Sequence, residues 1–341
     1  MLNKKEFIKS TLDWYDEGNR ILPWRSNPLP YYVWISEIML QQTRVEAVIP
    51  FFNRFIQSVP DIKTLSIMED DNLNKLWEGL GYYSRVRNLK KAAIIIMKEH
   101  NGVLPKTKKE LESLPGIGPY TSGAILSIAY NQKVAAVDGN VLRVFARLLG
   151  LKESIKDKNI KILIKDTVEE LLPNKRNGDF NQALMEIGAM ICIPNGTPKC
   201  EVCPHKKVCV ANLNGVANEI PVKMPKKKRR VEQRTVLVIK FRDKILLNKR
   251  PNNGLLAGLY EFPNMDGHVT ENEIVSLYKN EVLSITELPK SKHLFTHIEW
   301  HMIGYMIELK NEVSGLHWKS KQEIMEELSV PTAFKKYKNY L

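Results

Sequence analysis

Four cysteines constrain the fold of this chain more strongly than any other feature of its sequence. They are the only cysteines among 341 residues, and all of them lie between positions 192 and 209. A disulfide framework would be spread along the chain to join distant loops. The grouping instead predicts a metal site with the spacing Cys192-x7-Cys200-x2-Cys203-x5-Cys209.

Prolines and a glycine inside this cysteine loop bend the chain so that four thiolates can converge on one centre. Zinc and iron–sulfur clusters both take thiolate ligands, and the spacing alone leaves both occupants open. Four unrelated buried cysteines are the other interpretation, and it requires clustering by chance. His205, within the loop, is expected at the surface rather than among the ligands.

The length of the chain predicts two domains. Apolar residues recur at helical spacing from about residue 5 to residue 214, so residues 1–214 are expected to form an all-α domain. Residues 215–233 contain few apolar side chains and are expected to form a basic linker. Strand-like runs then predict an α+β domain over residues 234–341. The predicted fold class is therefore multidomain, α and α+β.

Charge and hydropathy limit the class of partner. The 51 Lys+Arg residues outnumber the 38 Asp+Glu residues, which gives a formal net charge of +13. Such a charge favours polyanion partners, although ribosomal, membrane-surface and heparin-binding proteins are equally basic. No stretch approaches the roughly 20 apolar residues of a membrane span, and the first residues lack the apolar core of a signal peptide. A cytoplasmic protein is expected, associated with the nucleoid if the source is bacterial.

Three patterns describe the predicted second domain. Thr235–Phe241 and Ile245–Lys249 form strand-like runs on either side of an Arg-Asp turn. A third strand is expected to run from His293 through Met302, with alternate residues on one face. The five basic residues Lys226–Arg230 are interpreted as a linker that follows phosphates rather than as a nuclear localisation signal.

A glycine-rich turn joins two helical patterns at Leu114-Pro-Gly-Ile-Gly-Pro119. Its glycines allow backbone N–H groups to approach a phosphate at the start of the next helix. Gly116, Gly118 and Thr121 are therefore predicted to contact a DNA backbone. With an aspartate about 20 residues further on and the cysteine loop, this turn resembles the helix–hairpin–helix DNA glycosylase superfamily.

Within that superfamily the chain is most similar to the MutY-type adenine DNA glycosylases, which remove adenine mispaired with 8-oxoguanine. The motifs that carry the resemblance extend over nearly the whole chain: Leu22-Pro-Trp-Arg25, Trp34-Ile-Ser-Glu-Ile-Met-Leu-Gln-Gln-Thr43, Gly79-Leu-Gly-Tyr-Tyr-Ser-Arg85, Val137-Asp-Gly-Asn140 and Phe180-Asn-Gln182. The resemblance implies a helix–hairpin–helix domain with a [4Fe–4S] loop, a Nudix-like C-terminal domain, a monomeric state, and duplex DNA with A:8-oxoguanine or A:G mispairs as partner.

One departure from the family lies in the cysteine loop. The family's first two cysteines usually enclose six residues, whereas Cys192 and Cys200 enclose seven. The extra residue is expected in the turn around Pro194-Asn-Gly196, where it need not displace a ligand.

Two carboxylates are the candidates for glycoside cleavage, which needs an acid for the leaving base and an anion for the cationic sugar. Glu37 lies in an apolar helical run that favours the neutral carboxyl of a general acid. A surface position on an amphipathic helix is the commoner fate of such a residue. Asp138 reads first as a helix N-cap, where N–H donors keep a carboxylate ionised. By resemblance, Tyr120 and Asn140 assist at the sugar and its water.

Position 120 separates two reaction types. The lyase branch of the superfamily, similar to endonuclease III, carries a Schiff-base lysine there, and Tyr120 cannot perform that chemistry. A monofunctional glycosylase is predicted. A glycosylase with lyase activity and a non-catalytic DNA-binding protein with a four-cysteine zinc site are the alternatives. The second domain lacks the acidic magnesium-binding helix of true Nudix hydrolases, so pyrophosphatase activity is not expected.

Base flipping requires side chains that fill the gap in the duplex and others that hold the extruded base. By resemblance, Gln42 and Tyr82 are the wedge candidates, and Thr296 and His297, from a Phe-Thr-His run, are candidates for reading 8-oxoguanine. Packing of Tyr82 and an ordinary strand position for Thr296 are the plainer interpretations. The other predicted recognition residues fall into a gap-lining group and an adenine-pocket group: Leu40, Gln41 and Thr43; Arg20, Trp24, Arg25 and Gln182.

Overall fold

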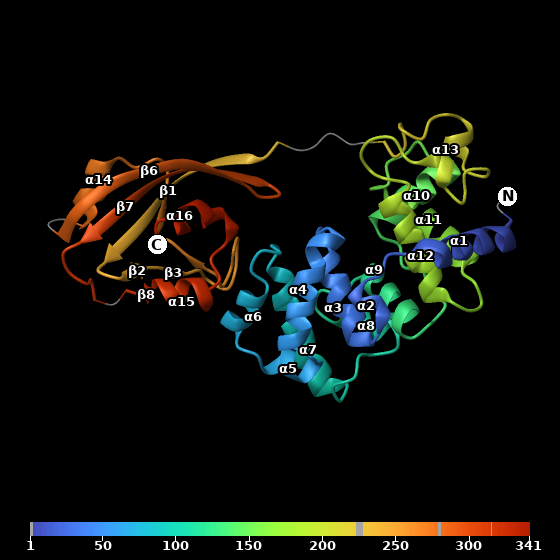
Figure 1. Ribbon diagram of the computed structural model, residues 1–341, viewed down its shortest axis with the longest axis horizontal. Helices are drawn as coiled ribbons and strands as arrows, with labels where there is room; N and C mark the ends of the chain where they lie inside the picture. The colour runs from blue at the N-terminus through green and yellow to red at the C-terminus, as the bar shows by residue number, and fades with distance from the viewer. Residues whose placement is uncertain (1–2, 223–227, 279–280, 315) are drawn as a thin grey trace. The chain divides into compact units, whose positions relative to one another are not determined.

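The computed structural model describes residues 3–222, 228–278, 281–314 and 316–341. The chain divides into two compact units (Figure 1). The first comprises Met1–Ile67 and Asn88–Pro225, and the second comprises Met68–Arg87 and Lys226–Leu341. This division differs from the predicted boundaries of 1–214, 215–233 and 234–341 mainly at Met68–Arg87, which joins the C-terminal unit. No helix among the described residues is long and apolar enough to span a membrane.

The first unit is helical, as predicted. Its helices are α1 (Lys4–Gly18), α2 (Pro23–Ser26), α3 (Pro30–Leu40), α4 (Val45–Ser58), α5 (Ile62–Ile67), most of α7 (Ser84–Glu99), α8 (Lys108–Ser113), α9 (Pro119–Ala124), α10 (Gly139–Leu149), α11 (Lys158–Leu171), α12 (Asn177–Met190) and α13 (Val210–Leu213). A π-helical turn, Ile125–Ala129, continues α9, and a 3₁₀ turn, Cys200–Val202, lies in the cysteine loop.

Helix α10 illustrates how the local sequence fixes an element that bears the site. Asp138 caps its N-terminus by accepting from the backbone N–H of Val141 at 2.8 Å. Gly150 ends it in the left-handed conformation, at φ 67°. Its apolar face buries Phe145 in a core shared with Phe7 of α1 and Phe180 of α12. The cap and this core together hold the N-terminus of α10, and with it Asp138, in a fixed position.

The second unit is built on a six-stranded sheet. Its main path runs β6 (Val282–Leu294), β7 (Ile298–Leu309), β1 (Arg230–Phe241), β2 (Lys244–Leu246) and β8 (Trp318–Ser320), and β5 (Asn264–Asp266) pairs with β1. Strands β3 (Asn248–Lys249) and β4 (Tyr260–Glu261) form a separate pair, and the helices are α6 (Asp70–Leu76), α14 (Glu271–Tyr278), α15 (Lys321–Glu326) and α16 (Lys335–Lys338).

Strand β1 reads as a continuous apolar run because both of its faces are covered. Val236 and Val238 face a core shared with Tyr337 of α16, while Leu237 and Ile239 face one shared with Ile274 of α14. The predicted Arg-Asp turn is confirmed, since Phe241 pairs with Lys244 in an antiparallel β1–β2 ladder. Strand β1 also begins at Arg230, inside the stretch predicted to be linker; Lys226 and Lys227 of the basic run lie outside the described residues.

The prediction of one strand over His293–Met302 is wrong. Strands β6 and β7 pair antiparallel, and the turn Phe295-Thr296-His297 connects them. The Phe295 N–H donates to the Ile298 carbonyl at 2.8 Å, which closes the turn. The reversal carries no glycine, proline or asparagine, so the usual sequence signals of a turn are missing. Phe295, Thr296 and His297 consequently do not alternate on a sheet face.

Met68–Arg87 belongs to the second unit because polar contacts join it there. Asp71 accepts from Lys249 at 2.7 Å and from the Tyr260 hydroxyl at 3.0 Å. Lys75 donates to two carbonyls at the end of α15, those of Met325 and Leu328. The Tyr83 hydroxyl, which is buried, lies 3.0 Å from that of Ser329. Such partners, distant in sequence, leave no local pattern.

Candidate active site and cysteine loop

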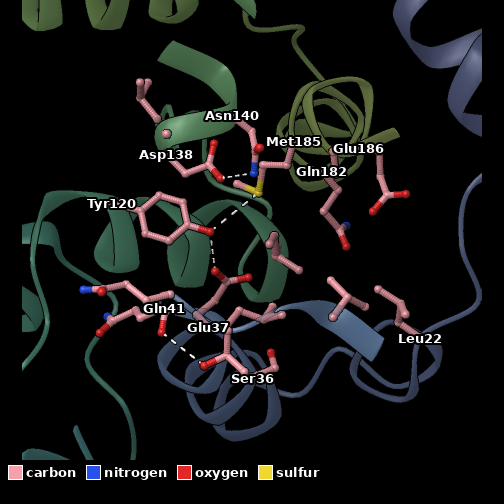
Figure 2. A pocket seen from close by; sticks show the side chains of 18 of the residues that line it. Leu22, Ser36, Glu37, Gln41, Tyr120, Asp138, Asn140, Gln182, Met185 and Glu186 are labelled. Carbon is pink, nitrogen blue, oxygen red and sulfur yellow. Dashed lines mark hydrogen bonds between the residues drawn. The ribbon is translucent and has the colours of Figure 1, made fainter. Parts of the chain in front are cut away.

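A pocket of about 960 Å³ opens in the first unit (Figure 2). Segments around α2, α3, α9, α10 and α12 line it. The structure brings twelve of the sequence-predicted site residues to this pocket: Arg20, Trp24, Arg25, Glu37, Leu40, Gln41, Gln42, Thr43, Tyr120, Asp138, Asn140 and Gln182. Residues predicted from distant parts of the sequence therefore share one cavity. Trp24 also packs edge-on against Phe52, with 5.2 Å between the ring centroids.

Glu37 projects from α3 and is 5% exposed, so it does not occupy the commoner surface position. Its carboxylate accepts a hydrogen bond from the Tyr120 hydroxyl of α9, and Figure 2 shows the two side chains pointing toward one another. Burial raises the pKa of Glu37 to about 7; the Tyr120 hydrogen bond acts to lower it and the charge of Asp138 to raise it. A carboxyl in this setting retains its proton close to neutral pH.

Asp138 lines the same pocket, at the N-terminus of α10. One carboxylate oxygen accepts from the Val141 N–H at 2.8 Å and the other from the Asn140 amide at 2.7 Å. Burial raises the pKa of Asp138, so the donors do not by themselves hold it low as the sequence suggests. These donors lower the pKa of Asp138 and so oppose the effect of burial. No backbone donor contributes in this way to the pKa of Glu37.

Arg143 joins this carboxylate to the cysteine loop. Its guanidinium donates to the Asn140 amide oxygen at 2.8 Å, to the Gly188 carbonyl at 2.7 Å and to the Cys192 carbonyl at 2.7 Å. Gly188 permits the approach, because a Cβ there would lie 2.5 Å from that of Asn140. No role was predicted for Arg143 from the sequence, although it lies one helical turn after Asn140.

Glu186 is the pocket residue that the sequence analysis missed. It projects from α12 with a side chain only 1% exposed. Arg20 and Arg25 both donate to it, at distances down to 2.6 and 2.8 Å. The spacing from the predicted Gln182 to Glu186 is four residues, which places both on one helical face and could have identified it.

Two predicted wedge residues adopt an unusual backbone. Gln42 has φ 59° and Tyr82 has φ 50°, in the left-handed region that non-glycine residues rarely occupy. Both side chains are exposed, Tyr82 to 48%. In the second unit the Tyr82 hydroxyl lies 3.4 Å from that of Thr296, itself exposed in the β6–β7 turn with His297. Strained and exposed positions of this kind are concentrated at functional sites.

The glycine-rich turn lies between α8 and α9, as predicted. Gly116 requires its residue type, since φ is 82° and a Cβ would lie 2.9 Å from that of Asn88. Gly118 caps the N-terminus of α9 with an extended backbone and open space around its α-carbon. Thr121 is 2% exposed, so its side chain packs in the core. The predicted contact of its backbone N–H with DNA stays a prediction.

The four cysteines are free thiols, each partly exposed. Cys192 follows α12, Cys200 begins the 3₁₀ turn, and Cys209 caps α13. Cys192 acts electrostatically on each of the other three, so the thiols share one neighbourhood, although no group of three or more ligands among the described residues has metal-binding geometry. Arg147 donates to the Cys192 sulfur at 3.1 Å, which suits a thiolate. The donor set fits a metal that prefers sulfur.

His205 corrects a further expectation. It is 3% exposed and stacks on Phe7 of α1 with 4.0 Å between ring centroids, rather than lying at the surface. One ring nitrogen lies 3.2 Å from the Thr11 hydroxyl. The residue fastens the cysteine loop to α1.

Comparisons with known proteins agree with this architecture. The model of the HhH-GPD superfamily of base excision DNA repair proteins matches residues 35–170, and that of the NUDIX domain matches residues 234–340. The chain is similar to the adenine DNA glycosylase of Buchnera aphidicola subsp. Baizongia pistaciae, with 40% identity over 86% of this chain and 83% of that protein.

Solved structures resemble the helical part of the chain. A thermostable thymine-DNA glycosylase matches with a TM-score of 0.57 and 30% identity, over 62% of this chain and 97% of that one. An endonuclease III in a non-covalent complex with DNA matches with a TM-score of 0.54 and 21% identity, over 63% and 99% of the two chains, and shows the fold alone. The relatives and both domain matches fit the order of domains and the pocket described above: the chain belongs to the adenine DNA glycosylase family, enzymes of base excision DNA repair.

Proposed function

We propose that this enzyme hydrolyses the N-glycosidic bond of adenine mispaired with 8-oxoguanine, or with guanine, in duplex DNA. The observation that carries the proposal is that two carboxyl groups in different environments line one pocket. Glu37 has a pKa raised to about 7, and Asp138 accepts hydrogen bonds from two donors. Paired carboxyl groups in unequal environments are the usual apparatus of glycoside cleavage. The family's substrate specificity supports the choice of adenine.

The proposed mechanism assigns a separate task to each carboxyl group. An extruded adenine enters the pocket, and Glu37 transfers its proton to N7 as the glycosidic bond breaks. Electrons of that bond leave with the base, and the cationic sugar is stabilised by the Asp138 carboxylate, or bonded covalently by it at C1′. Asn140 holds Asp138 in place, and Tyr120 orients the Glu37 carboxyl through its hydrogen bond. Water then attacks C1′, displacing Asp138 where a covalent bond has formed, and its proton passes to the Glu37 carboxylate that the first step left ionised.

The other predicted recognition residues are proposed to hold the base and its duplex. Arg20, Trp24, Arg25 and Gln182 border the adenine, while Gln42 and Tyr82 fill the gap that it leaves. Leu40, Gln41 and Thr43 line that gap, and the glycines of the turn before α9 contact the DNA backbone. The exposed, left-handed positions of Gln42 and Tyr82 support their assignment.

The experiment that tests this function is single-turnover cleavage of matched A:8-oxoguanine, A:G and A:T duplexes. Adenine release should be fastest from the 8-oxoguanine pair and slowest from A:T. Borohydride treatment of the same reactions should trap little covalent complex, because Tyr120 offers no amine for a Schiff base. Equal rates on all three duplexes would refute the substrate assignment, and abundant trapping would favour the lyase alternative.

We further propose that Cys192, Cys200, Cys203 and Cys209 hold a [4Fe–4S] cluster. The free thiols, their shared neighbourhood and the Arg147 contact to Cys192 support it, and so does the resemblance to a family that carries such a cluster. When bound, such a cluster would serve to fix the loop beside α10 and α12. The residues of the pocket perform the excision chemistry.

The purified protein should be coloured and contain iron, with thiolate–iron absorbance in the visible range. Cys203→Ser should lose most of the iron and that absorbance, because it removes one of four ligands. Val202→Ser, an exposed neighbour at 64%, should retain both and controls for the substitution itself. A colourless wild-type protein that contains zinc would contradict the cluster.

Recognition of 8-oxoguanine is assigned to Thr296, whose hydroxyl can donate to or accept from the oxidised base. Thr296→Ala should reduce the preference for A:8-oxoguanine over A:G by about 2- to 10-fold, the value of one hydrogen bond, with the chemical step on A:G nearly unchanged. Thr286→Ala, at an exposed residue of β6, is the matched control. An unaltered preference in Thr296→Ala would remove its assigned role.

A further inference from the structure

A buried ionic cluster of Glu186, Arg20 and Arg25 lines the pocket. Glu186 of α12 receives a forked contact from Arg20, whose Nε lies 3.1 and 2.9 Å from the two carboxylate oxygens and whose Nη2 lies 2.6 Å from Oε1. Arg25 adds a bond from its Nη2 to the same Oε1 at 2.8 Å. One buried carboxylate thus organises two guanidinium groups.

Glu186 is the main anchor of Arg25. The other Arg25 contacts are one bond from Nη1 to the Arg20 carbonyl at 3.2 Å and a position over the Tyr15 ring, 5.9 Å from its centroid. Arg25 Nε is buried and has no hydrogen-bond partner. Since α2 is a single turn, Pro23–Ser26, its backbone supplies little rigidity of its own. The carboxylate from α12 therefore determines where the Arg25 charge lies.

The positive charge of Arg25 acts on Glu37, the proposed general acid. Arg25 is a cationic influence on Glu37, where it favours the ionised form. Although burial acts to raise it, the bonds from Arg20 and the charge of Arg25 hold the pKa of Glu186 below its ordinary value, so Glu186 is an anion inside the pocket wall. An anion beside Arg25 reduces the net positive field at Glu37.

We propose that Glu186 is a positioning residue for adenine excision, which holds the Arg20 and Arg25 guanidiniums at the pocket wall and offsets the positive charge of Arg25 beside Glu37. This inference rests on the proposed role of Glu37 as general acid. The proposed role differs from a purely structural one, because a structural ion pair would affect stability without altering the pH dependence of the reaction.

Other charged groups near Glu37 must be included in the test. The elements packed against α3 contribute Arg25 from α2, Glu46 from α4 and Tyr120 from α9, and the π-helical turn Ile125–Ala129 contributes none. Asp138 faces Glu37 from the start of α10. Of these, Glu46 is the useful comparison, because it also pairs with Arg20, at 3.6 Å, but is 76% exposed.

The experiment measures single-turnover adenine release from an A:8-oxoguanine duplex between about pH 5 and pH 9. Wild type should lose activity as pH rises through the pKa of Glu37, about 7. Glu186→Gln should move this midpoint down by about 0.5–1 unit, so that activity lost at pH 7.5 returns in part at lower pH. Glu186→Asp keeps the charge and should restore the midpoint close to that of wild type. Glu46→Gln should shift it much less, because its charge is screened by solvent.

Arg25→Gln provides a second test that does not depend on the folding of the Glu186 variants. Removal of the cation should move the midpoint up, in the opposite direction to Glu186→Gln. Unshifted midpoints in both Glu186→Gln and Arg25→Gln, with normal wild-type excision, would overturn the inference and leave the proposed function intact. A wild type without selective adenine release would instead refute the proposed function.

Discussion

Glu37→Gln is expected to slow adenine release by about 10²- to 10⁴-fold, the contribution of a well-placed general acid. Glutamine has nearly the same shape and can still accept the Tyr120 hydrogen bond, so the pocket should keep its form. It cannot transfer a proton to the leaving base. Single-turnover rates on an A:8-oxoguanine duplex, measured with enzyme in excess, isolate this chemical step from product release.

Three observations would accompany a correct assignment of Glu37. DNA binding by Glu37→Gln should be close to that of wild type, and its alkaline pH limb should disappear, because the titrating carboxyl is gone. Glu17→Gln, exposed on α1, should behave as wild type. Rates for Glu37→Gln within a factor of two or three of the wild-type rate would show that another group delivers the proton.

Asp138→Asn is expected to reduce the rate by about 10²- to 10³-fold, comparable to the loss of one electrostatic contact to a charged transition state. Asparagine is as good an N-cap as aspartate, so α10 should remain intact while the negative charge is removed. The two functions of this residue, cap and anion, are thereby separated. Single-turnover rates and thermal unfolding, measured on the same preparation, report them independently.

The matched control for Asp138 is Asp157→Asn. Asp157 caps α11 by accepting from the N–H groups of Asn159 and Ile160, and it is exposed. The free energy of unfolding of both variants should lie within about 1–2 kcal/mol of the wild-type value, since both keep a capping oxygen. Only Asp138→Asn should lose activity. Equal activities in the two variants would reduce Asp138 to a cap.

Local patterns in the sequence were sufficient for much of the helical unit. The Asp138 cap precedes a run with helical apolar spacing, and the glycines at 116 and 118 sit where α8 and α9 are joined. Such features depend on neighbouring residues, which a sequence displays directly. Apart from Glu37 and Asp138, which local patterns also marked, the twelve pocket residues came from the family resemblance, since no local rule brings α3, α9 and α12 together.

The sequence-based predictions that were wrong or incomplete also have physical causes. The β6–β7 turn lacks the residues that usually mark a reversal, so Phe295–His297 resembled strand. His205 is polar and was expected at the surface, yet its partners Phe7 and Thr11 come from the far N-terminus. Glu186 was overlooked because a helical glutamate is ordinarily solvated, and its two arginines lie more than 160 positions away.

The membership of Met68–Arg87 in the second unit has a consequence for dissecting the enzyme. The chain enters that unit twice, once at Met68 and once at Lys226. A fragment that stops at Pro225 would keep Asp71, Lys75 and Tyr83 but lose Lys249, the end of α15 and Ser329, their respective partners. Activity lost on such a truncation would therefore reflect an unpaired surface on Met68–Arg87 as well as the loss of the proposed 8-oxoguanine contacts.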